Sequence, residues 1–133
     1  MDCPPSLGAL TVNALTAADN LVIPMSPAVY TMQGTNDLMA TVTKVKKNLN
    51  PSLSLLGVII NAFDSIPVIT REIRSEIEES FGGHTFKSVL SKSIKIEEAI
   101  AKKDGLITLQ KGKVKDEIIL IGEELIHRVE AAC

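Results

Sequence analysis

The sequence predicts an α/β fold with a parallel sheet of about four strands flanked by helices. Two short aliphatic runs, residues 21–23 (LVI) and 53–61 (LSLLGVIIN), are typical of strands that are buried on both faces. Residues 89–90 and 106–109 (LITL) are weaker strand candidates. Segments of helical periodicity lie between these runs, and the alternation implies right-handed crossovers between parallel strands.

Four helices are predicted from apolar spacing and from end signals. The first covers residues 5–18 and has a proline at its start, where the missing N–H has no intrahelical partner to lose. The other three follow apolar stripes with a spacing of three or four residues. These stripes are Leu38, Val42, Val45 and Leu49; Ile69, Ile73, Ile77 and Phe81; and Val114, Ile118, Ile121, Leu125 and Val129. Two glycines, Gly82 and Gly83, are expected to end the second stripe.

Length and composition predict a single domain over residues 1–133 with an aliphatic core. The hydrophobic fraction is 45%, but Trp is absent and only three Phe and one Tyr are present. A charged fraction of 23% and a net charge of -2 argue against disorder. The two cysteines, Cys3 and Cys133, have no metal-site or disulfide spacing, and no secretory signal or bilayer-spanning run is recognised. We therefore expect a reducing, cytoplasmic compartment.

The chain begins almost directly on a helix, with no strand before it. A parallel sheet of about four strands would then leave an apolar edge that normally has a neighbouring strand. Two explanations remain open at this point. Either another chain completes the sheet, or the sequence is a piece of something longer.

Residues 2–8 (DCPPSLG) are the most informative stretch. In a nucleotide-binding α/β fold, a carboxylate at the C-terminal end of a strand is well placed to hold a water on Mg²⁺. The prolines and the glycine set a fixed turn into the next helix, where backbone N–H groups can meet a phosphate. The alternative interpretation is that Asp2 only caps a helix near the chain end.

This stretch, together with the segments LTVNAL and AAD that follow it, resembles the Walker B and switch II region of the ParA/Soj family. The members of that family are MinD-like P-loop ATPases with a deviant Walker motif. Further short matches follow in the order of the family. They are residues 22–24 (VIP), Tyr30 with Gln33 and Gly34, and residues 49–51 (LNP), 56–58 (LGV), 81–82 (FG) and 98–99 (EA). The resemblance covers the whole chain. It implies the C-terminal part of such an ATPase, from the Walker B motif onward, with a partial P-loop NTPase-type sheet that lacks the N-terminal P-loop strand.

The resemblance assigns roles to the N-terminal residues. Asp2 would be the Walker B-type carboxylate that acts indirectly on Mg²⁺, through a water. The switch II segment that senses the γ-phosphate would be formed by Pro4, Pro5, Ser6 and Gly8.

The resemblance also implies ATP and Mg²⁺ as cofactors of the complete protein. Asn61 matches the position that reads adenine, and a role as a strand-end turn residue is equally open. The phosphate-binding loop of the family would precede this chain, and no Gly-x-x-x-x-Gly-Lys-Ser/Thr or Lys-Gly-Gly pattern occurs here. Because that loop supplies most backbone N–H contacts to the phosphates, this chain alone is expected neither to bind ATP tightly nor to hydrolyse it.

A basic segment covers residues 87–115. It holds eight lysines and three acidic residues, a net charge of +5, so the rest of the chain carries -7. Such asymmetry favours non-specific binding of a phosphate backbone, although a solvated lysine face is as common. In the resembling family a basic surface of this region binds DNA on the nucleotide-dependent dimer. Lys92 and Lys95 match positions that are commonly arginine there, and Arg71 and Arg74 could add to weak DNA binding.

One departure from the family lies beside these lysines. Ser91 stands where the family usually has a proline, which puts the local geometry in question. A second departure is Ile66, which replaces a further arginine of many relatives.

Two function classes follow. In the first, the chain is part of a plasmid or chromosome partition ATPase that is cytoplasmic and nucleoid-associated. Such an ATPase homodimerises and acts with a ParB-like centromere-binding partner. In the second, the chain is a stand-alone binding module that homodimerises or pairs with a full-length relative. A small-molecule enzyme has little support, because His84 and His127 are far apart and neither lies beside a nucleophile. A membrane partner is not expected, because residues 116–133 hold five acidic residues and one Arg.

Overall fold

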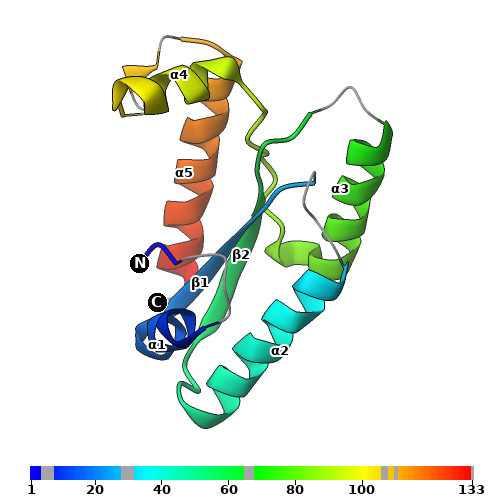
Figure 1. Ribbon diagram of the computed structural model, residues 1–133, viewed down its shortest axis with the longest axis vertical. Coiled ribbons are helices and arrows are strands. Elements are labelled where there is room, and N and C mark those ends of the chain that lie inside the picture. Colours follow the sequence, from blue (N-terminus) through cyan, green and yellow to red (C-terminus); the bar gives the residue numbers. More distant parts are fainter. Residues whose placement is uncertain (4–7, 28–31, 65–67, 106–107, 110, 133) are drawn as a thin grey trace. The chain divides into compact units, whose positions relative to one another are not determined.

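The computed structural model describes residues 1–3, 8–27, 32–64, 68–105, 108–109 and 111–132. In chain order its elements are α1 (Ala9–Ala17), β1 (Asn20–Met25), α2 (Met32–Asn48), β2 (Ser54–Ile60), α3 (Val68–Phe81), the 3-10 turn η1 (Gly82–His84), α4 (Ile94–Lys102) and α5 (Lys113–Ala132) (Figure 1). This order confirms the α/β class. The chain groups into two compact units, Met1–Val22 with Tyr30–Leu56 and Ile23–Val29 with Gly57–Cys133. The single domain over residues 1–133 stays a prediction.

The sheet consists of β1 and β2, which pair in parallel and are joined through α2. At the start of the pair, Ser54 N–H donates to the O atom of Asp19, the residue before β1, at 3.0 Å. At its end, the N–H of Asn61, the residue after β2, donates to Met25 O at 2.8 Å. In the described residues the sheet therefore has two strands rather than the predicted four or so. Of the predicted strand at residues 106–109, Leu106 and Ile107 lie outside the described residues. Thr108 belongs to a turn, with its N–H on Gly105 O at 3.0 Å.

Residues 85–92, which we call the edge segment, run beside β2 without forming a regular strand. Only isolated parallel bridges join them to β2 and its extension, Val58 with Thr85 and Phe63 with Ser91. Phe86 N–H donates to Val58 O and Leu90 N–H to Ile60 O, each at 2.9 Å. The predicted strand at residues 89–90 is thus an irregular neighbour of β2.

The first unit has a small aliphatic core between α1 and α2. Its buried members are Leu15, Val42, Val45 and Leu53. The apolar stripe predicted for α2 is confirmed at Val42 and Val45 but not at Leu49. The helix ends at Asn48, so Leu49 lies outside it and is 55% exposed.

Asn50 replaces Leu49 as the buried residue at the end of α2. Its Nδ2 donates to Leu15 O at 3.0 Å and to Ala18 O at 2.7 Å. Its Oδ1 accepts a hydrogen bond from Ser52 Oγ at 2.7 Å. These bonds satisfy two carbonyls at the C-terminal end of α1, which have no partner within that helix.

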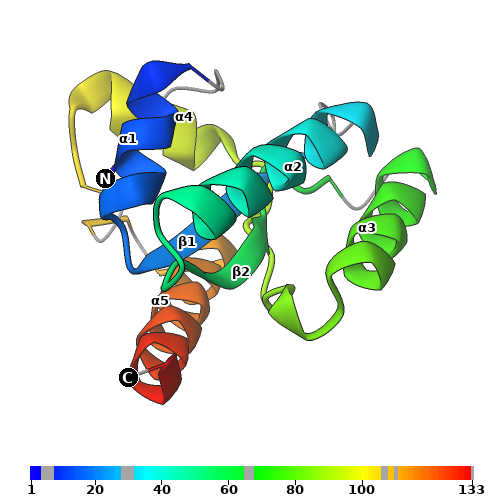
Figure 2. The same ribbon diagram turned by 90° about the horizontal axis from the view of Figure 1, so that it is seen from below.

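The second unit buries Val58, Ile60, Ile77 and Phe86, each at most 1% exposed. The stripe predicted for α3 is confirmed at Ile77, but its first residue, Ile69, is 60% exposed. The helix ends at Phe81, before the two glycines, as predicted. Figure 2 shows that η1 follows α3 directly and that the chain then turns back toward β2. No described helix is long and apolar enough to cross a membrane.

Gly57 lets the edge segment approach β2 closely. A Cβ built at this position would overlap the ring of Phe86 and lie 2.8 Å from His84 O. Gly57 itself is buried in the middle of β2, so the strand has no room to shift. Packing in the second unit thus depends on the absence of a side chain here.

We predict that Gly57→Ala lowers the free energy of unfolding by about 1–3 kcal/mol, because the added methyl group overpacks this contact. Gly122→Ala is the matched control: no atom lies within 4 Å of its Cβ, and it stands inside α5. Removing a helical glycine should stabilise by about 0.5–1 kcal/mol. Urea unfolding followed by circular dichroism measures both, and a harmless Gly57→Ala would contradict the close approach.

We also predict that Asn50→Ala lowers the free energy of unfolding by about 1–3 kcal/mol, because two carbonyls of the first unit lose their donor. Asn48→Ala is the control, since Asn48 is exposed and bonds only within its own helix, to Lys44 O. Its effect should stay within about 0.5 kcal/mol. Equal effects of the two changes on the free energy of unfolding, in the same urea titration, would show that the buried hydrogen bonds of Asn50 add no stability beyond that of an exposed one.

Candidate functional site

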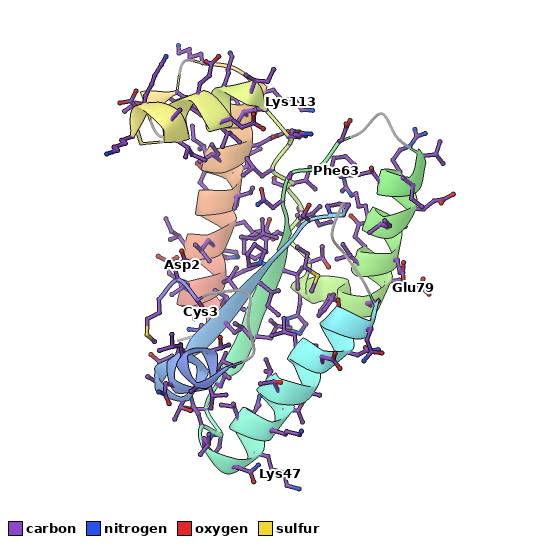
Figure 3. All side chains as sticks on the ribbon, in the orientation of Figure 1. Asp2, Cys3, Lys47, Phe63, Glu79 and Lys113 are labelled. Carbon is purple, nitrogen blue, oxygen red and sulfur yellow. The ribbon has the colours of Figure 1, made fainter. Side chains whose placement is uncertain are left out.

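The N-terminal motif is only partly described. Asp2 and Cys3 are exposed and belong to no helix or strand (Figure 3). Pro4, Pro5 and Ser6 lie outside the described residues. Gly8 is exposed and occupies the N-cap of α1, which begins at Ala9 rather than at residue 5 as predicted. Gly8 therefore stands at the helix start where the alternative interpretation would have put Asp2.

The donor set around Asp2 fits Mg²⁺ only in one way. No group of three or more His, Cys, Asp or Glu in the described parts of the chain could hold a metal ion. Mg²⁺, however, is commonly held by one or two carboxylates, by waters and by substrate phosphates. An exposed single carboxylate is compatible with that arrangement, in which a bound nucleotide would have to supply further ligands.

Asn61 lies directly after β2. Its side-chain Oδ1 accepts a hydrogen bond from Ala62 N–H at 2.8 Å, and Ala62 has a left-handed backbone with φ 52°. This geometry fits the turn role of Asn61. The side chain is exposed, and its Nδ2 makes no hydrogen bond to the described part of the chain. The adenine role stays a prediction.

Lys92 and Lys95 stand on either side of the start of α4. Lys92 N–H donates to Phe63 O at 2.9 Å, which ties its backbone to the end of β2. Ser93 caps α4, and its Oγ accepts a hydrogen bond from Lys95 N–H at 3.2 Å. Both lysine side chains are exposed. The fold thus presents the two predicted lysines to solvent on a fixed turn.

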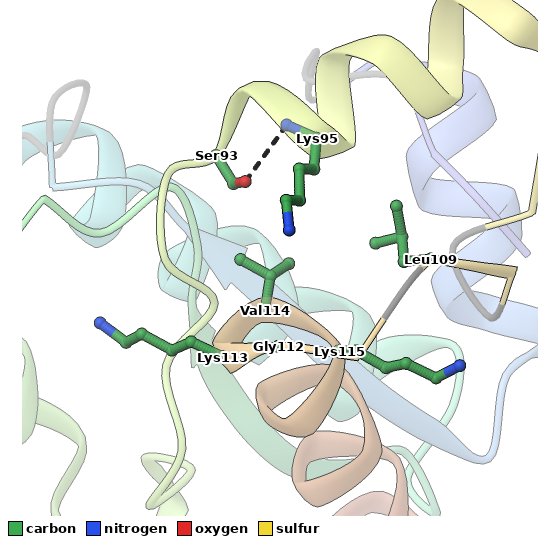
Figure 4. Close-up of a pocket in the computed structure, with 7 residues that line it drawn as sticks. All are labelled: Ser93, Lys95, Leu109, Gly112, Lys113, Val114 and Lys115. Carbon is green, nitrogen blue, oxygen red and sulfur yellow. Dashed lines mark hydrogen bonds between the residues drawn. The ribbon is translucent and has the colours of Figure 1, made fainter.

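Lys95 also lines a shallow hollow of about 220 Å³ between α4 and α5 (Figure 4). Its lining consists of Ser93, Lys95, Leu109, Gly112, Lys113, Val114 and Lys115. Figure 4 shows Lys95 extending from α4 toward Val114, while Lys113 and Lys115 extend from α5 in opposite directions. A Cβ on Gly112 would lie 3.9 Å from Lys95 Nζ.

The hollow has the charge of an anion-binding surface. Two helices begin at it, α4 after Ser93 and α5 after Gly112, and the first N–H groups of a helix carry partial positive charge. Three lysines add full charges, which Glu97 and Asp116 in the first turns of the two helices and Glu117 beside Lys113 partly offset. The sequence prediction missed Lys113 and Lys115 as partners of Lys95, although both belong to the basic segment. Their position after Gly112, at the start of an apolar stripe, was the available signal.

The two arginines considered for the same surface lie on α3 and do not line the hollow. Arg74 Nε donates to Glu78 Oε1 at 2.8 Å, and its guanidinium lies 5.4 Å from the centre of the Phe63 ring. Arg71 is exposed. Arg74 is therefore already engaged, and the DNA role of both residues stays a prediction.

Curated relatives match most of the chain. It is 33% identical over 129 residues to the chromosome partitioning protein ParA of Myxococcus xanthus, a match that covers 96% of this chain and 46% of the relative. It is 37% identical over 99 residues to the sporulation initiation inhibitor protein Soj of Bacillus subtilis, covering 74% of this chain and 39% of that protein. The chain thus spans less than half the length of these two relatives. A family profile described as AAA domain matches residues 1–55.

A solved structure supports the same relationship. The cobyrinic acid a,c-diamide synthase of Mycobacterium smegmatis with bound ADP and magnesium superposes with a TM-score of 0.62 and 29% identity, over 70% of this chain and 38% of that chain. The same protein has also been solved with a bound ATP analogue and magnesium. The N-terminal motif, the α/β fold and these relatives agree, and the chain belongs to the ParA/Soj family.

Proposed function

We propose that this chain is the C-terminal part of a ParA/Soj-type partition ATPase and that its basic hollow binds the backbone of duplex DNA without base specificity. The observation that carries the proposal is the arrangement of Lys95, Lys113 and Lys115 around the hollow at two helix N-termini. In the complete protein, ATP with Mg²⁺ would drive homodimerisation, and a ParB-like partner would act on it. Such a protein would act in the cytoplasm, on the nucleoid.

The spread of the lysines favours a polyanion over a small anion. Lys113 and Lys115 extend away from each other (Figure 4), an arrangement that suits separate phosphates better than a single one. Successive phosphates of a nucleic-acid backbone can contact them separately. Lysine is a point charge with a flexible stem and lacks the planar fork that arginine uses on base edges. Such contacts fix position on the duplex and carry no sequence information.

The proposed nucleotide binding depends on the N-terminal motif and on Asn61. Asp2 would hold a Mg²⁺-bound water, the switch II residues Pro4, Pro5, Ser6 and Gly8 would respond to the γ-phosphate, and Asn61 would contact adenine. When bound, Mg²⁺ neutralises charge on the phosphates. These roles follow from the position of the motif in the family. The adenine role of Asn61 is further supported by its side-chain Nδ2, which the turn leaves available to donate a hydrogen bond.

A second candidate is a stand-alone module that homodimerises or pairs with a full-length relative. Two large apolar side chains on α4 favour it, because Ile94 is 73% exposed and Ile100 is 68% exposed. Sedimentation velocity of the chain, alone and with a full-length ParA-type protein, shows whether a complex forms, and the anisotropy assay below then measures how well that complex binds DNA. A stable complex that binds DNA no better than the chain alone would favour the module.

We predict that the double change Lys92→Ala and Lys95→Ala weakens retention of duplex DNA at low salt. Two fewer phosphate contacts should reduce the slope of log K against log salt by about 1.8. Lys46→Ala with Lys47→Ala removes the same charge from the end of α2, outside the hollow, and is the matched control. Fluorescence anisotropy over a salt series measures both. If the two double variants behave alike, charge alone explains binding; if the first leaves retention unchanged, the DNA proposal fails.

We further predict that the purified chain neither binds ATP at micromolar concentration nor releases phosphate. The reason is the lack of a phosphate-binding loop pattern anywhere in its sequence. Equilibrium dialysis with labelled ATP and a phosphate-release assay with Mg²⁺ test it, and Asp2→Ala is the control. Micromolar binding, or phosphate release that Asp2→Ala abolishes, would contradict the prediction.

A further inference from the structure

Glu117, on the second turn of α5, accepts two hydrogen bonds from one residue of the edge segment. Its Oε2 accepts from Ser91 N–H at 2.8 Å, and its Oε1 accepts from Ser91 Oγ–H at 2.7 Å. The side chain of Glu117 is only 12% exposed, and Ser91 is buried. A nearly buried carboxylate with two short bonds fixes both partners more firmly than a surface contact does.

This contact joins the two walls of the basic hollow. Ser91 leads directly into Lys92, Ser93 and the first turn of α4, which carries Lys95. On the other wall, Glu117 Oε1 lies 3.7 Å from Lys113 Nζ, one helical turn earlier on α5. The Ser91–Glu117 pair therefore connects the segment that leads into α4 with the start of α5.

Two further residues of the same helix face hold the edge segment further along. Glu124 Oε2 accepts a hydrogen bond from Lys87 N–H at 3.0 Å, seven residues after Glu117 on α5. Arg128 donates to Thr85 O at 3.1 Å and to Glu124 Oε1 at 2.7 Å, and it lies 4.4 Å from the centre of the Phe86 ring. The Ser91–Glu117 pair is the attachment nearest the lysines.

We propose that Glu117, acting through Ser91, is a positioning residue for the DNA contacts. It holds Lys92 and Lys95 in a fixed relation to Lys113 and Lys115, so that all four lysines meet successive phosphates together. This inference rests on the proposed DNA binding. It also explains why an acidic side chain stands inside a basic surface.

Positioning and charge make opposite predictions for this residue. Glu117→Ala removes a negative charge next to Lys113, so long-range electrostatics alone would tighten DNA binding. If Glu117 positions the lysines, its loss weakens binding although every lysine is still present. Losing one simultaneous phosphate contact reduces the salt slope by about 0.9 and the affinity by roughly tenfold at low salt.

The experiment compares four variants in a fluorescence anisotropy salt series with duplex DNA. Glu117→Ala should bind roughly tenfold more weakly than the parent chain, and Glu117→Gln, which keeps one acceptor oxygen, should recover part of the loss. Ser91→Ala removes one of the two bonds without changing the charge and should show a smaller loss. Asp116→Asn is the matched control, because Asp116 is the exposed neighbour and its carboxylate makes no bond to the described residues. It should bind as tightly as the parent chain or more tightly.

Amide hydrogen exchange shows whether the contact itself behaves as described. The Ser91 amide should exchange slowly in the parent chain and faster in Glu117→Ala, with the fold checked by circular dichroism. If Glu117→Ala does not fold, Ser91→Ala and Glu117→Gln decide. Absence of DNA binding by the parent chain would overturn the proposed function. DNA binding by the parent chain with equal or tighter binding by Glu117→Ala and Ser91→Ala would overturn the positioning role alone.

Discussion

The structure depends on satisfying the backbone of β2 along both edges. Val58 and Ile60 are fully buried, so their N–H and C=O groups have no access to water and must find partners in the protein. β1 supplies partners on one edge, and the edge segment supplies donors on the other through Phe86 and Leu90. Because the edge segment is irregular, side chains from α5 complete its own bonding. The long last helix is thus tied to the edge segment by polar contacts.

This requirement also sets where the basic residues stand. Lys92 N–H makes the last of these hydrogen bonds to the extension of β2, and α4 starts two residues later. The start of α5 is fixed by its contact to the same stretch. The lysines of the hollow therefore stand on elements whose position is determined by a buried strand, although Lys95 and Lys113 are themselves exposed and Lys115 is half-buried. A rigid support of this kind favours simultaneous contacts with an extended ligand.

Local apolar patterns predicted most of the elements, and long-range polar contacts explain what they missed. Helices α2 and α3 follow from residues such as Val42, Val45 and Ile77, whose spacing records burial directly. The same spacing predicted α5, although none of its described residues is buried. The irregular path at Val89 and Leu90 could not be read in this way, since it depends on carboxylates 26 and 37 residues further along the chain. For the site, the resemblance and the charge pattern identified Lys92 and Lys95. Their meeting with the start of α5 is a result of tertiary packing.

The bonds between Ser91 and Glu117 make the two positions interdependent during sequence divergence. A proline at position 91 would offer neither an N–H nor a hydroxyl donor. A chain with that proline would leave the nearly buried carboxylate of Glu117 with only its 3.7 Å contact to Lys113 Nζ, at a cost of about 1–3 kcal/mol for the lost hydrogen bonds. An apolar residue at position 117 would leave the buried donors of Ser91 unmet at a similar cost. Lineages should therefore exchange both residues together, as a proline with an apolar residue or as a serine with an acid, and mixed pairs should be rare intermediates.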